Sequence, residues 1–313
     1  MSSKIVLLGT GGTIAGTAAN AGDNVGYTAG QLGVAHLLGA IPALAGLPLA
    51  SEQVAQLDSK DMSFAVWQQL AARCAHHLAQ ADVAGIVITH GTDTLEETAW
   101  FLQSVLSPAA KPVVLTCAMR PATSVAADGP QNLIDAVAVA SAPGAHGVVV
   151  VAAGTIHGAA DVQKDHPYRV DAFSSGDAGP IGYVEEGRLR LMRNWPEATV
   201  NSLKFAIDTG APNREWPRVD IVMNYAGADG TVVDALLARG VDGIVVACTG
   251  NGTLHEALEA ALIRAQAAGV RVVRATRCAR GRVLPQAQAR LRDSAGLSPV
   301  KARVAMLLEL MAD

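Results

Sequence analysis

The chain has 313 residues and a formal net charge of −4, and 50% of its residues are hydrophobic while only 4% are aromatic. This charge balance gives no basic surface for nucleic acid or membrane, so we expect neither as a partner and favour a small-molecule substrate. No run of about 18 consecutive apolar residues predicts a transmembrane helix. A core built mostly of Ala, Val, Leu and Ile is typical of layered α/β proteins, and the length suits two domains.

Strands and helices alternate along the first part of the chain. Candidate strands are residues 4–8, 83–88, 112–116 and 147–152, and candidate helices are 63–81, 95–103 and 131–141. Such alternation predicts a doubly wound, mostly parallel sheet. We therefore expect a larger N-terminal catalytic α/β domain over residues 1–190.

Residues rich in Pro, Asn and charge interrupt this pattern from about 190 to 218, and we expect a linker over residues 191–217. Beyond it the expected strands are 219–223, 241–247 and 270–273, and the expected helices are 231–239 and 254–267. Ser298-Pro299 is a typical start for one last helix. The sequence thus predicts a smaller C-terminal α/β domain over residues 218–313.

A glycine-rich segment, residues 9–16, directly follows the first strand with the sequence Gly-Thr-Gly-Gly-Thr-Ile-Ala-Gly. Glycines let backbone amides approach a ligand and let the chain turn tightly. A dinucleotide fingerprint counted from Gly9 would need glycine where Ile14 stands, and the chain has no phosphate-binding Gly-x-x-x-x-Gly-Lys-Ser/Thr motif. Thr13 remains as a hydroxyl held in this turn.

A second polar segment, Ile-Thr-His-Gly-Thr-Asp-Thr at residues 88–94, ends the apolar run 83–88. Parallel sheets place their ligand sites at the carboxyl ends of their strands. Thr94 and Glu97 also match a capping box for the helix 95–103. One cap requires one oxygen and is worth ~1 kcal/mol, whereas this segment carries three polar residues in a row. The excess favours a ligand-binding loop.

These two loops resemble the signature segments of bacterial-type L-asparaginases and glutaminase-asparaginases. The matching residues are 11–16 and 89–98. Further landmarks occur in the family's order at residues 59–62, 118–121, 128–133, 161–164, 179–183 and 250–254. The resemblance covers essentially the whole chain. It implies an amidohydrolase that converts L-asparagine to L-aspartate and ammonia through an acyl-enzyme, without metal or cofactor.

Amide hydrolysis requires a nucleophile, a proton acceptor and donors for the tetrahedral oxyanion. The resemblance implies that Thr13 is the nucleophile, that Tyr27 activates it, and that Lys164 forms a triad with Thr92 and Asp93. The residues alone leave Tyr27 open as an exposed loop tyrosine and Lys164 as a surface lysine. A lysine accepts a proton at neutral pH only if burial or charge lowers its pKa.

The resemblance also implies how the substrate is held. Asp93 would receive the α-ammonium group, Ser59 and amides near Gly91 and Thr92 the α-carboxylate, and the Thr92 amide the oxyanion. The Ala118 carbonyl would face the leaving nitrogen. The expected binding residues are Gly12, Ser59, Lys60, Gly91, Thr92, Asp93 and Ala118.

The chain departs from the family pattern near the substrate's amino end. Lys60 replaces the usual Gln or Glu, and Thr253 replaces the usual Asn or Ser. Many members carry a glutamate that completes the neighbouring subunit's site, but residues 280–294 contain only Asp293 as an acid. These changes leave open a glutaminase-asparaginase, another amide preference, or a non-catalytic amino-acid-binding protein. A binding protein needs only part of the expected set, so retention of all five catalytic residues favours an enzyme.

Other residues have simpler interpretations. Cys74, Cys117, Cys248 and Cys278 show no paired or metal-ligand spacing, which indicates reduced thiols. His90, His157 and His255 are isolated in the sequence, so we expect structural or solvent-facing roles and no metal.

The remaining expectations concern location, assembly and motion. The first strand follows the start of the sequence at once, which favours a cytoplasmic protein, or a periplasmic one if a signal peptide was removed. The family resemblance implies a homotetramer, a dimer of dimers. Residues 16–28 are rich in Gly, Ala and Asn and poor in apolar bulk, so we expect a lid that carries Tyr27 onto Thr13.

Overall fold

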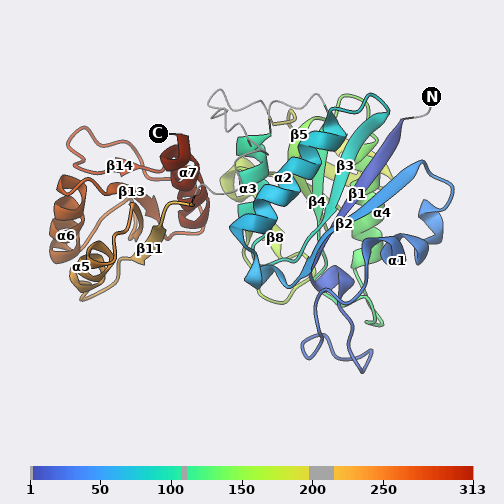
Figure 1. Cartoon of the computed structure of the whole chain (residues 1–313), viewed down its shortest axis with the longest axis horizontal. Coiled ribbons are helices and arrows are strands. Elements are labelled where there is room, and N and C mark those ends of the chain that lie inside the picture. The colour runs from blue at the N-terminus through green and yellow to red at the C-terminus, as the bar shows by residue number, and fades with distance from the viewer. Residues whose placement is uncertain (1–2, 107–110, 197–214, 313) are drawn as a thin grey trace. The chain divides into compact units, whose positions relative to one another are not determined.

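A computed structural model of the protein describes residues 3–106, 111–196 and 215–312 (Figure 1). The chain divides into two compact units, Met1–Ser202 and Leu203–Asp313. No helix in the described ranges has both the length and the hydropathy needed to cross a bilayer.

The N-terminal unit contains an eight-stranded sheet with the order β10-β9-β6-β5-β4-β3-β1-β2. Its parallel strands are β1 (Lys4–Gly11), β2 (Leu49–Leu57), β3 (Val83–Thr89), β4 (Pro112–Thr116) and β5 (Gly147–Ala152). The strands β6 (Thr155–Gly158), β9 (Gly182–Glu185) and β10 (Arg188–Leu191) extend the sheet in antiparallel fashion. The expected mostly parallel sheet is confirmed.

Four strands of this sheet were not expected from the sequence. Strand β2 lies at the edge of the sheet, and Val54 is its one buried residue, so it has no apolar run to identify it. The antiparallel strands β6, β9 and β10 have only four residues each, too few for a clear period. At the start of the expected linker, the backbone N–H groups of Met192 and Arg193 donate to the carbonyl oxygen of Ile181. Residues 197–214 of the expected linker lie outside the described residues.

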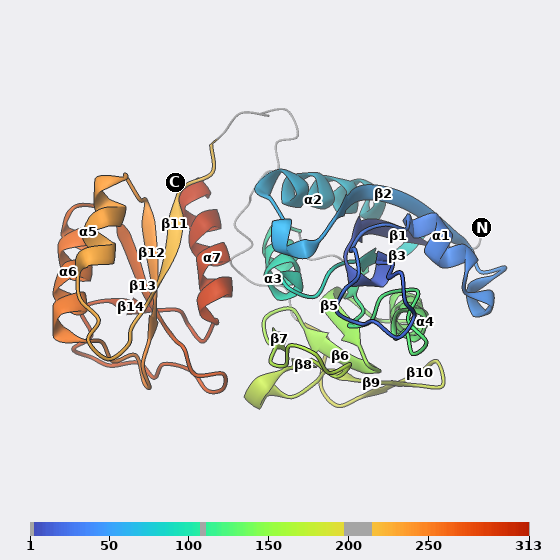
Figure 2. The same ribbon diagram turned by 90° about the horizontal axis from the view of Figure 1, so that it is seen from below.

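Four helices cover the two faces of this sheet (Figures 1 and 2). Helices α1 (Val34–Gly39) and α4 (Gly129–Ala140) pack on one face, and α2 (Phe64–Leu78) and α3 (Leu95–Val105) pack on the other. The core on the α4 face joins Val87 and Val114 from the strands to Leu133 and Ala136 from the helix. The three longer helices lie within a turn of their expected bounds, because their apolar spacing is regular.

The strand order determines where loops meet. Strand β1 lies between β2 and β3. The chain that leaves β1 continues to β2 on one side of it, and the next strand, β3, lies on the other side of β1. Such a reversal of strand order opens a crevice at the carboxyl ends of the strands. The loops that follow β1 and β3 therefore come together at this end of the sheet.

The expected capping box at the start of α3 is wrong. Thr94 does precede the helix, but its side chain makes no capping bond. The Thr94 hydroxyl donates instead to the carbonyl oxygen of Ser59 at 2.8 Å. A tertiary hydrogen bond thus replaces the local one and ties the loop after β3 to the 3₁₀ turn Ser59–Asp61.

The C-terminal unit is the expected smaller α/β domain. Its four parallel strands, in order, are β11 (Val219–Met223), β12 (Gly243–Cys248), β13 (Arg271–Thr276) and β14 (Arg292–Asp293). Helices α5 (Thr231–Ala238) and α6 (Glu256–Ala267) cover one face, and α7 (Pro299–Ala312) covers the other (Figure 2). The Ser298 hydroxyl accepts the Lys301 N–H at 3.5 Å, which confirms the expected start of α7.

A charged cluster ties the edge strand β2 to α2. Glu52 accepts two hydrogen bonds from Arg73, at 2.6 and 2.9 Å, and lies 2.9 Å from His77 Nε2. Arg73 and His77 are one turn apart on α2, so both reach the same carboxylate. The hydrogen bonds from Arg73 lower the pKa of Glu52 below its usual value of 4.5.

We predict that Glu52→Gln lowers the free energy of unfolding by about 1 kcal/mol at neutral pH, since the pair is partly exposed. Because the folded-state pKa is lowered, this contribution is present above pH 4.5 and is lost as the pH falls through the folded-state pKa. Urea unfolding of both proteins between pH 3 and pH 7 measures it. The exposed pair of Glu185 with Arg190 offers a control, Glu185→Gln, which should change stability less. An equal difference at every pH would contradict the prediction.

Candidate active site

The loops after β1 and β3 are in backbone contact. Gly12 has φ of 82° and ψ of −173°, a region that is essentially restricted to glycine. A Cβ atom on Gly12 would lie 2.4 Å from the Cα and N atoms of Gly91. Between these loops, the Thr10 hydroxyl donates to the Thr89 carbonyl at 2.9 Å. Two glycines thus allow Thr13 and Thr92 to be held on adjacent loops.

Thr13 begins the 3₁₀ turn Thr13–Ala15 and is 6% exposed. Its Oγ1 lies 2.6 Å from the hydroxyl oxygen of Tyr27. Thr17 and Thr28 pair through two backbone hydrogen bonds of 3.0 and 2.9 Å, which close the segment between them and place Tyr27 beside Thr13. The structure therefore brings these two expected site residues together.

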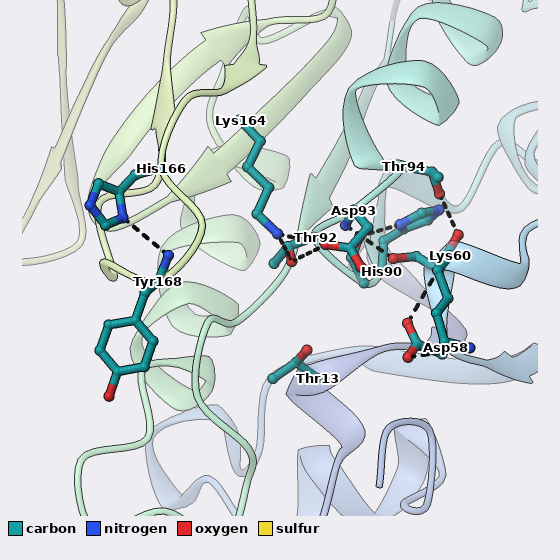
Figure 3. A network of polar contacts seen from close by, with 12 residues as sticks. Thr13, Asp58, Lys60, His90, Thr92, Asp93, Thr94, Lys164, His166 and Tyr168 are labelled. Carbon is teal, nitrogen blue, oxygen red and sulfur yellow. Dashed lines mark hydrogen bonds and ion pairs between the residues drawn. The ribbon is translucent and has the colours of Figure 1, made fainter. Parts of the chain in front are cut away.

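Lys164 reaches the loop after β3 from the short strand β7 (Gln163–Lys164), which pairs with β8 (Phe173–Ser174). Its amino group donates to Thr92 Oγ1 at 2.8 Å and to Asp93 Oδ1 at 2.6 Å. The Lys164 side chain is 18% exposed and that of Asp93 is 51% exposed. Figure 3 shows Lys164 pointing at both side chains, with Thr13 below them. Lys164, Thr92 and Asp93 form one contact cluster, so Lys164 is no free surface lysine.

Ser59 connects a third loop to this cluster. It is 2% exposed, its hydroxyl accepts the Asp93 N–H at 3.1 Å, and its carbonyl accepts the Thr94 hydroxyl. A Cβ atom on Gly91 would lie 2.5 Å from Ser59 Oγ. The absence of a side chain at Gly91 therefore makes room for Ser59.

The Lys60 side chain contacts the acidic residues next to it in the sequence. Its amino group pairs with Asp61 and lies 3.9 Å from Asp58 (Figure 3). The hydrogen bond to Asp61 raises the pKa of Lys60, and the charge of Asp93 contributes in the same direction. The Lys60 side chain is 60% exposed, and its ammonium group lies within the electrostatic reach of Asp93.

Ala118 follows β4, is 1% exposed, and lies in a braced loop. The Asp128 carboxylate accepts the N–H groups of Met119 and Arg120, both at 2.9 Å, and Asn132 donates to the Cys117 carbonyl at 2.9 Å. Burial raises the pKa of Asp128 above its usual value. Residues 128–133 resemble a family landmark, and their hydrogen bonds support the loop after β4. The sequence alone does not indicate this supporting role.

The isolated histidines have structural contacts. His90 is fully buried and contacts Gly91 and Thr98, His157 lies 2.8 Å from the Ser175 hydroxyl, and His255 caps α6. Among the described residues, no group of His, Cys, Asp and Glu side chains could hold a metal ion. All four cysteines are free thiols, and only Cys278 is exposed.

Comparisons with known proteins identify the family. Residues 4–197 match the family model "Asparaginase, N-terminal", and residues 218–312 match "Glutaminase/Asparaginase C-terminal domain". The chain belongs to the asparaginase family. L-asparaginase 2 of Escherichia coli is 39% identical over 98% of this chain and 88% of its own length. The glutaminase-asparaginase of Pseudomonas fluorescens is 37% identical over 88% of this chain and 75% of its own.

A solved structure extends this likeness to the fold. The crystal structure of a "probable cytoplasmic L-asparaginase" from Campylobacter jejuni matches with a TM-score of 0.93 and 37% identity. The match covers 100% of this asparaginase-family chain and 97% of the other. The family expected from the two threonine-containing loops is confirmed.

We predict that Gly12→Ala abolishes turnover, because the added methyl group would collide with the backbone of Gly91 and separate the two loops. Gly46→Ala is the matched control: Gly46 has φ of 80°, but a Cβ atom there meets nothing within 4 Å. Both positions have a positive φ, so both variants should also lose about 1 to 3 kcal/mol from backbone strain alone. Full activity of Gly12→Ala, measured beside thermal unfolding of both variants, would contradict the prediction.

Proposed function

We propose that the protein hydrolyses L-asparagine to L-aspartate and ammonia through an acyl-enzyme on Thr13. The observation that carries this proposal is a pair of threonine hydroxyls on adjacent loops, each bonded to a group that can exchange a proton. Thr13 lies 2.6 Å from the Tyr27 hydroxyl, and Thr92 lies 2.8 Å from the Lys164 amino group. The names of the relatives, L-asparaginase and glutaminase-asparaginase, support the same chemistry.

The reaction would proceed in two halves. Thr13 Oγ1 attacks the side-chain carbonyl carbon while its proton passes to the Tyr27 oxygen and the Tyr27 hydroxyl proton passes on toward the side-chain nitrogen, so that Tyr27 gains and loses one proton and a tetrahedral intermediate forms. The C–N bond then breaks as the nitrogen takes that proton, and ammonia departs. Water attacks the resulting ester, which releases L-aspartate and restores the Thr13 hydroxyl. Thr92, Asp93 and Lys164 would serve as the second proton relay.

The same loops offer groups for the ends of the amino acid. The half-exposed Asp93 carboxylate binds Lys164 through Oδ1, which leaves Oδ2 for the α-ammonium group. The Ser59 hydroxyl and the amides near Gly91 and Thr92 would hold the α-carboxylate, and the Thr92 N–H would face the oxyanion. Gly12 and Lys60 would border the bound substrate, and the Ala118 carbonyl would receive the leaving nitrogen.

We propose asparagine as the preferred substrate and glutamine as a weaker one. A side chain longer by one methylene must displace its carbonyl from Thr13, and such a misfit costs only ~1 to 3 kcal/mol. Discrimination is therefore partial. Lys60, whose ammonium group is already paired with acidic neighbours, is the residue whose replacement should change recognition of the amino end.

We propose a homotetramer of paired dimers, in keeping with the closed symmetry of most soluble assemblies. We also propose domains over residues 1–190 and 218–313, joined by a linker over 191–217. We place the protein in the cytoplasm, because the similar Campylobacter jejuni protein is called cytoplasmic and because the free cysteines of this chain fit a reducing compartment.

We predict that Thr13→Ala lowers kcat for L-asparagine by about 1,000-fold or more, since the acyl group loses its attachment. Thr92→Ala should have a similarly large effect. Thr17→Ala, which removes a hydroxyl from the same segment and leaves the backbone pairing with Thr28 intact, should keep its activity. Ammonia release from L-Asn, D-Asn, L-Gln and acylated amides measures both turnover and preference. Activity of Thr13→Ala within about tenfold of wild type would refute the nucleophile.

We propose that the segment 16–28 is a lid, held to the loop at residues 122–125 by hydrogen bonds. Ala18 N–H donates to Thr123 Oγ1 at 2.9 Å, and Val125 N–H donates to the Ala21 carbonyl at 3.1 Å. The first of these bonds is exposed, and Val25 is 77% exposed, so little apolar surface holds the segment down. Opening would break these hydrogen bonds and the bond between Ser124 and Asn24, and it would carry Tyr27 away from Thr13.

We predict that Tyr27→Phe lowers kcat by about 100-fold or more while KM changes little, because the ring's packing stays and the hydroxyl is lost. Tyr168→Phe is the control, since Tyr168 is a half-exposed tyrosine whose ring stacks under Arg120. Hydrogen exchange of residues 16–28 should slow when aspartate binds. Normal turnover in Tyr27→Phe with unchanged exchange would eliminate the lid.

A further inference from the structure

A chain of three buried hydrogen bonds runs from α2 through α3 to the loop after β3. Trp67 Nε1 donates to Thr98 Oγ1 at 2.9 Å, and Thr98 Oγ1 lies 2.9 Å from His90 Nε2. The other ring nitrogen, His90 Nδ1, lies 2.7 Å from the carbonyl oxygen of Gly91. Trp67 is 4% exposed, and both Thr98 and His90 are 0% exposed. Loss of a partner at this depth would leave a buried polar group unpaired, which is costly.

The two ends of this chain fix its direction. An indole N–H can only donate, and a backbone carbonyl can only accept. His90 Nδ1 must therefore carry a proton. Burial lowers the pKa of His90 to about 4, so the ring is neutral at physiological pH and Nε2 holds a lone pair. Thr98 therefore accepts from Trp67 and donates to Nε2. With the His90 proton on Nδ1, every donor and acceptor in these three hydrogen bonds has a partner.

The carbonyl at the end of the chain belongs to the peptide that joins Gly91 to Thr92. No peptide bond of the described residues is cis, and in a trans peptide the C=O and N–H groups point in opposite directions. A carbonyl held toward the buried histidine therefore turns the Thr92 N–H away from that histidine. Within the described residues, no backbone or side-chain acceptor is bonded to that N–H.

A glycine makes this restraint necessary. Gly91 has no side chain because Ser59 Oγ and the Gly12 backbone occupy the space where a Cβ atom would lie. The same absence gives its backbone wide freedom, so the Gly91–Thr92 peptide could rotate and withdraw its N–H. The contact with Gly12 fixes the position of the loop, and the hydrogen bond from His90 fixes the rotation of the peptide.

We propose that His90 is a positioning residue that holds the Gly91–Thr92 peptide with its N–H facing the reacting carbonyl. Trp67 and Thr98 act through it by fixing the tautomer and the plane of the ring. The inference rests on the proposed function for the identity of the reaction. It adds a residue that touches neither substrate nor nucleophile but determines whether an oxyanion donor is available.

Two substitutions at one position separate positioning from packing. His90→Leu and His90→Asn both lose the bond to Thr98, so both should lower the melting temperature. Asn can place its Nδ2 amino group where Nδ1 was and still donate to Gly91, whereas Leu cannot. We expect His90→Leu to lower kcat by about 100-fold with little change in KM, and His90→Asn to recover most of that loss.

The measurements are steady-state kinetics on L-asparagine, thermal unfolding, and ¹⁵N spectra of histidine-labelled protein. Wild type should show a pyrrole-type nitrogen at Nδ1 and a pyridine-type nitrogen at Nε2 of His90. Equal kcat values for the Leu and Asn variants, a change in KM alone, or the opposite tautomer would each overturn the inference. An active Thr13→Ala would instead refute the proposed function, so the two failures are distinguishable.

Discussion

The backbone contact between Gly12 and Gly91 is the constraint on which the site depends. A Cβ atom on Gly12 would lie 2.4 Å from Gly91, so the loops after β1 and β3 approach only because Gly12 lacks a side chain, and a Cβ atom on Gly91 would lie 2.5 Å from Ser59 Oγ and 3.1 Å from the Gly12 Cα atom. The strand order supplies the reason that these loops meet at all, since β1 and β3 are neighbours at the point where the order reverses. Thr13 and Thr92 follow the two glycines, and the contact carries them to one place.

Around this contact, each polar group is held by a separate part of the fold. Thr13 is fixed from its own loop by Tyr27, Thr92 from the β7 strand by Lys164, and the Asp93 amide by Ser59. Behind them, buried hydrogen bonds complete the support. Preorganised donors cost no reorganisation during the reaction, which is why buried polar partners are useful here despite the cost of desolvation. Hydrogen bonds on the β3 side are buried, whereas several of those that hold the segment 16–28 are exposed.

Two departures from the family pattern lie in different units of the chain, Lys60 at the exposed margin of this arrangement and Thr253 in the C-terminal unit. Lys60 sits in a small acidic cluster with Asp58 and Asp61, beside the buried Ser59. Thr253 pairs with Thr249 within the C-terminal unit through reciprocal hydrogen bonds. Lys60 bonds to Asp58 and Asp61 and to neither the Thr13–Tyr27 nor the Thr92–Lys164 pair.

The sequence by itself determined the fold class, the main strands and helices, the two loops at strand ends, and the family. These features depend on local patterns, because apolar runs, helical spacing and glycine positions encode burial and turns within a few residues. It did not determine strand β2, whose edge position leaves only Val54 buried, nor the use of the Thr94 hydroxyl, which a local capping rule assigned to the helix.

Only the tertiary structure decided which polar groups meet. Lys164 and Thr92 are 72 residues apart, and Ser59 is 34 residues from Asp93, so no local period relates them. His90 looked like an isolated residue because its partners, Trp67 and Thr98, lie on two other elements. A side chain's hydrogen-bond partner depends on strand order and helix packing, and these are properties of the folded chain rather than of any short segment.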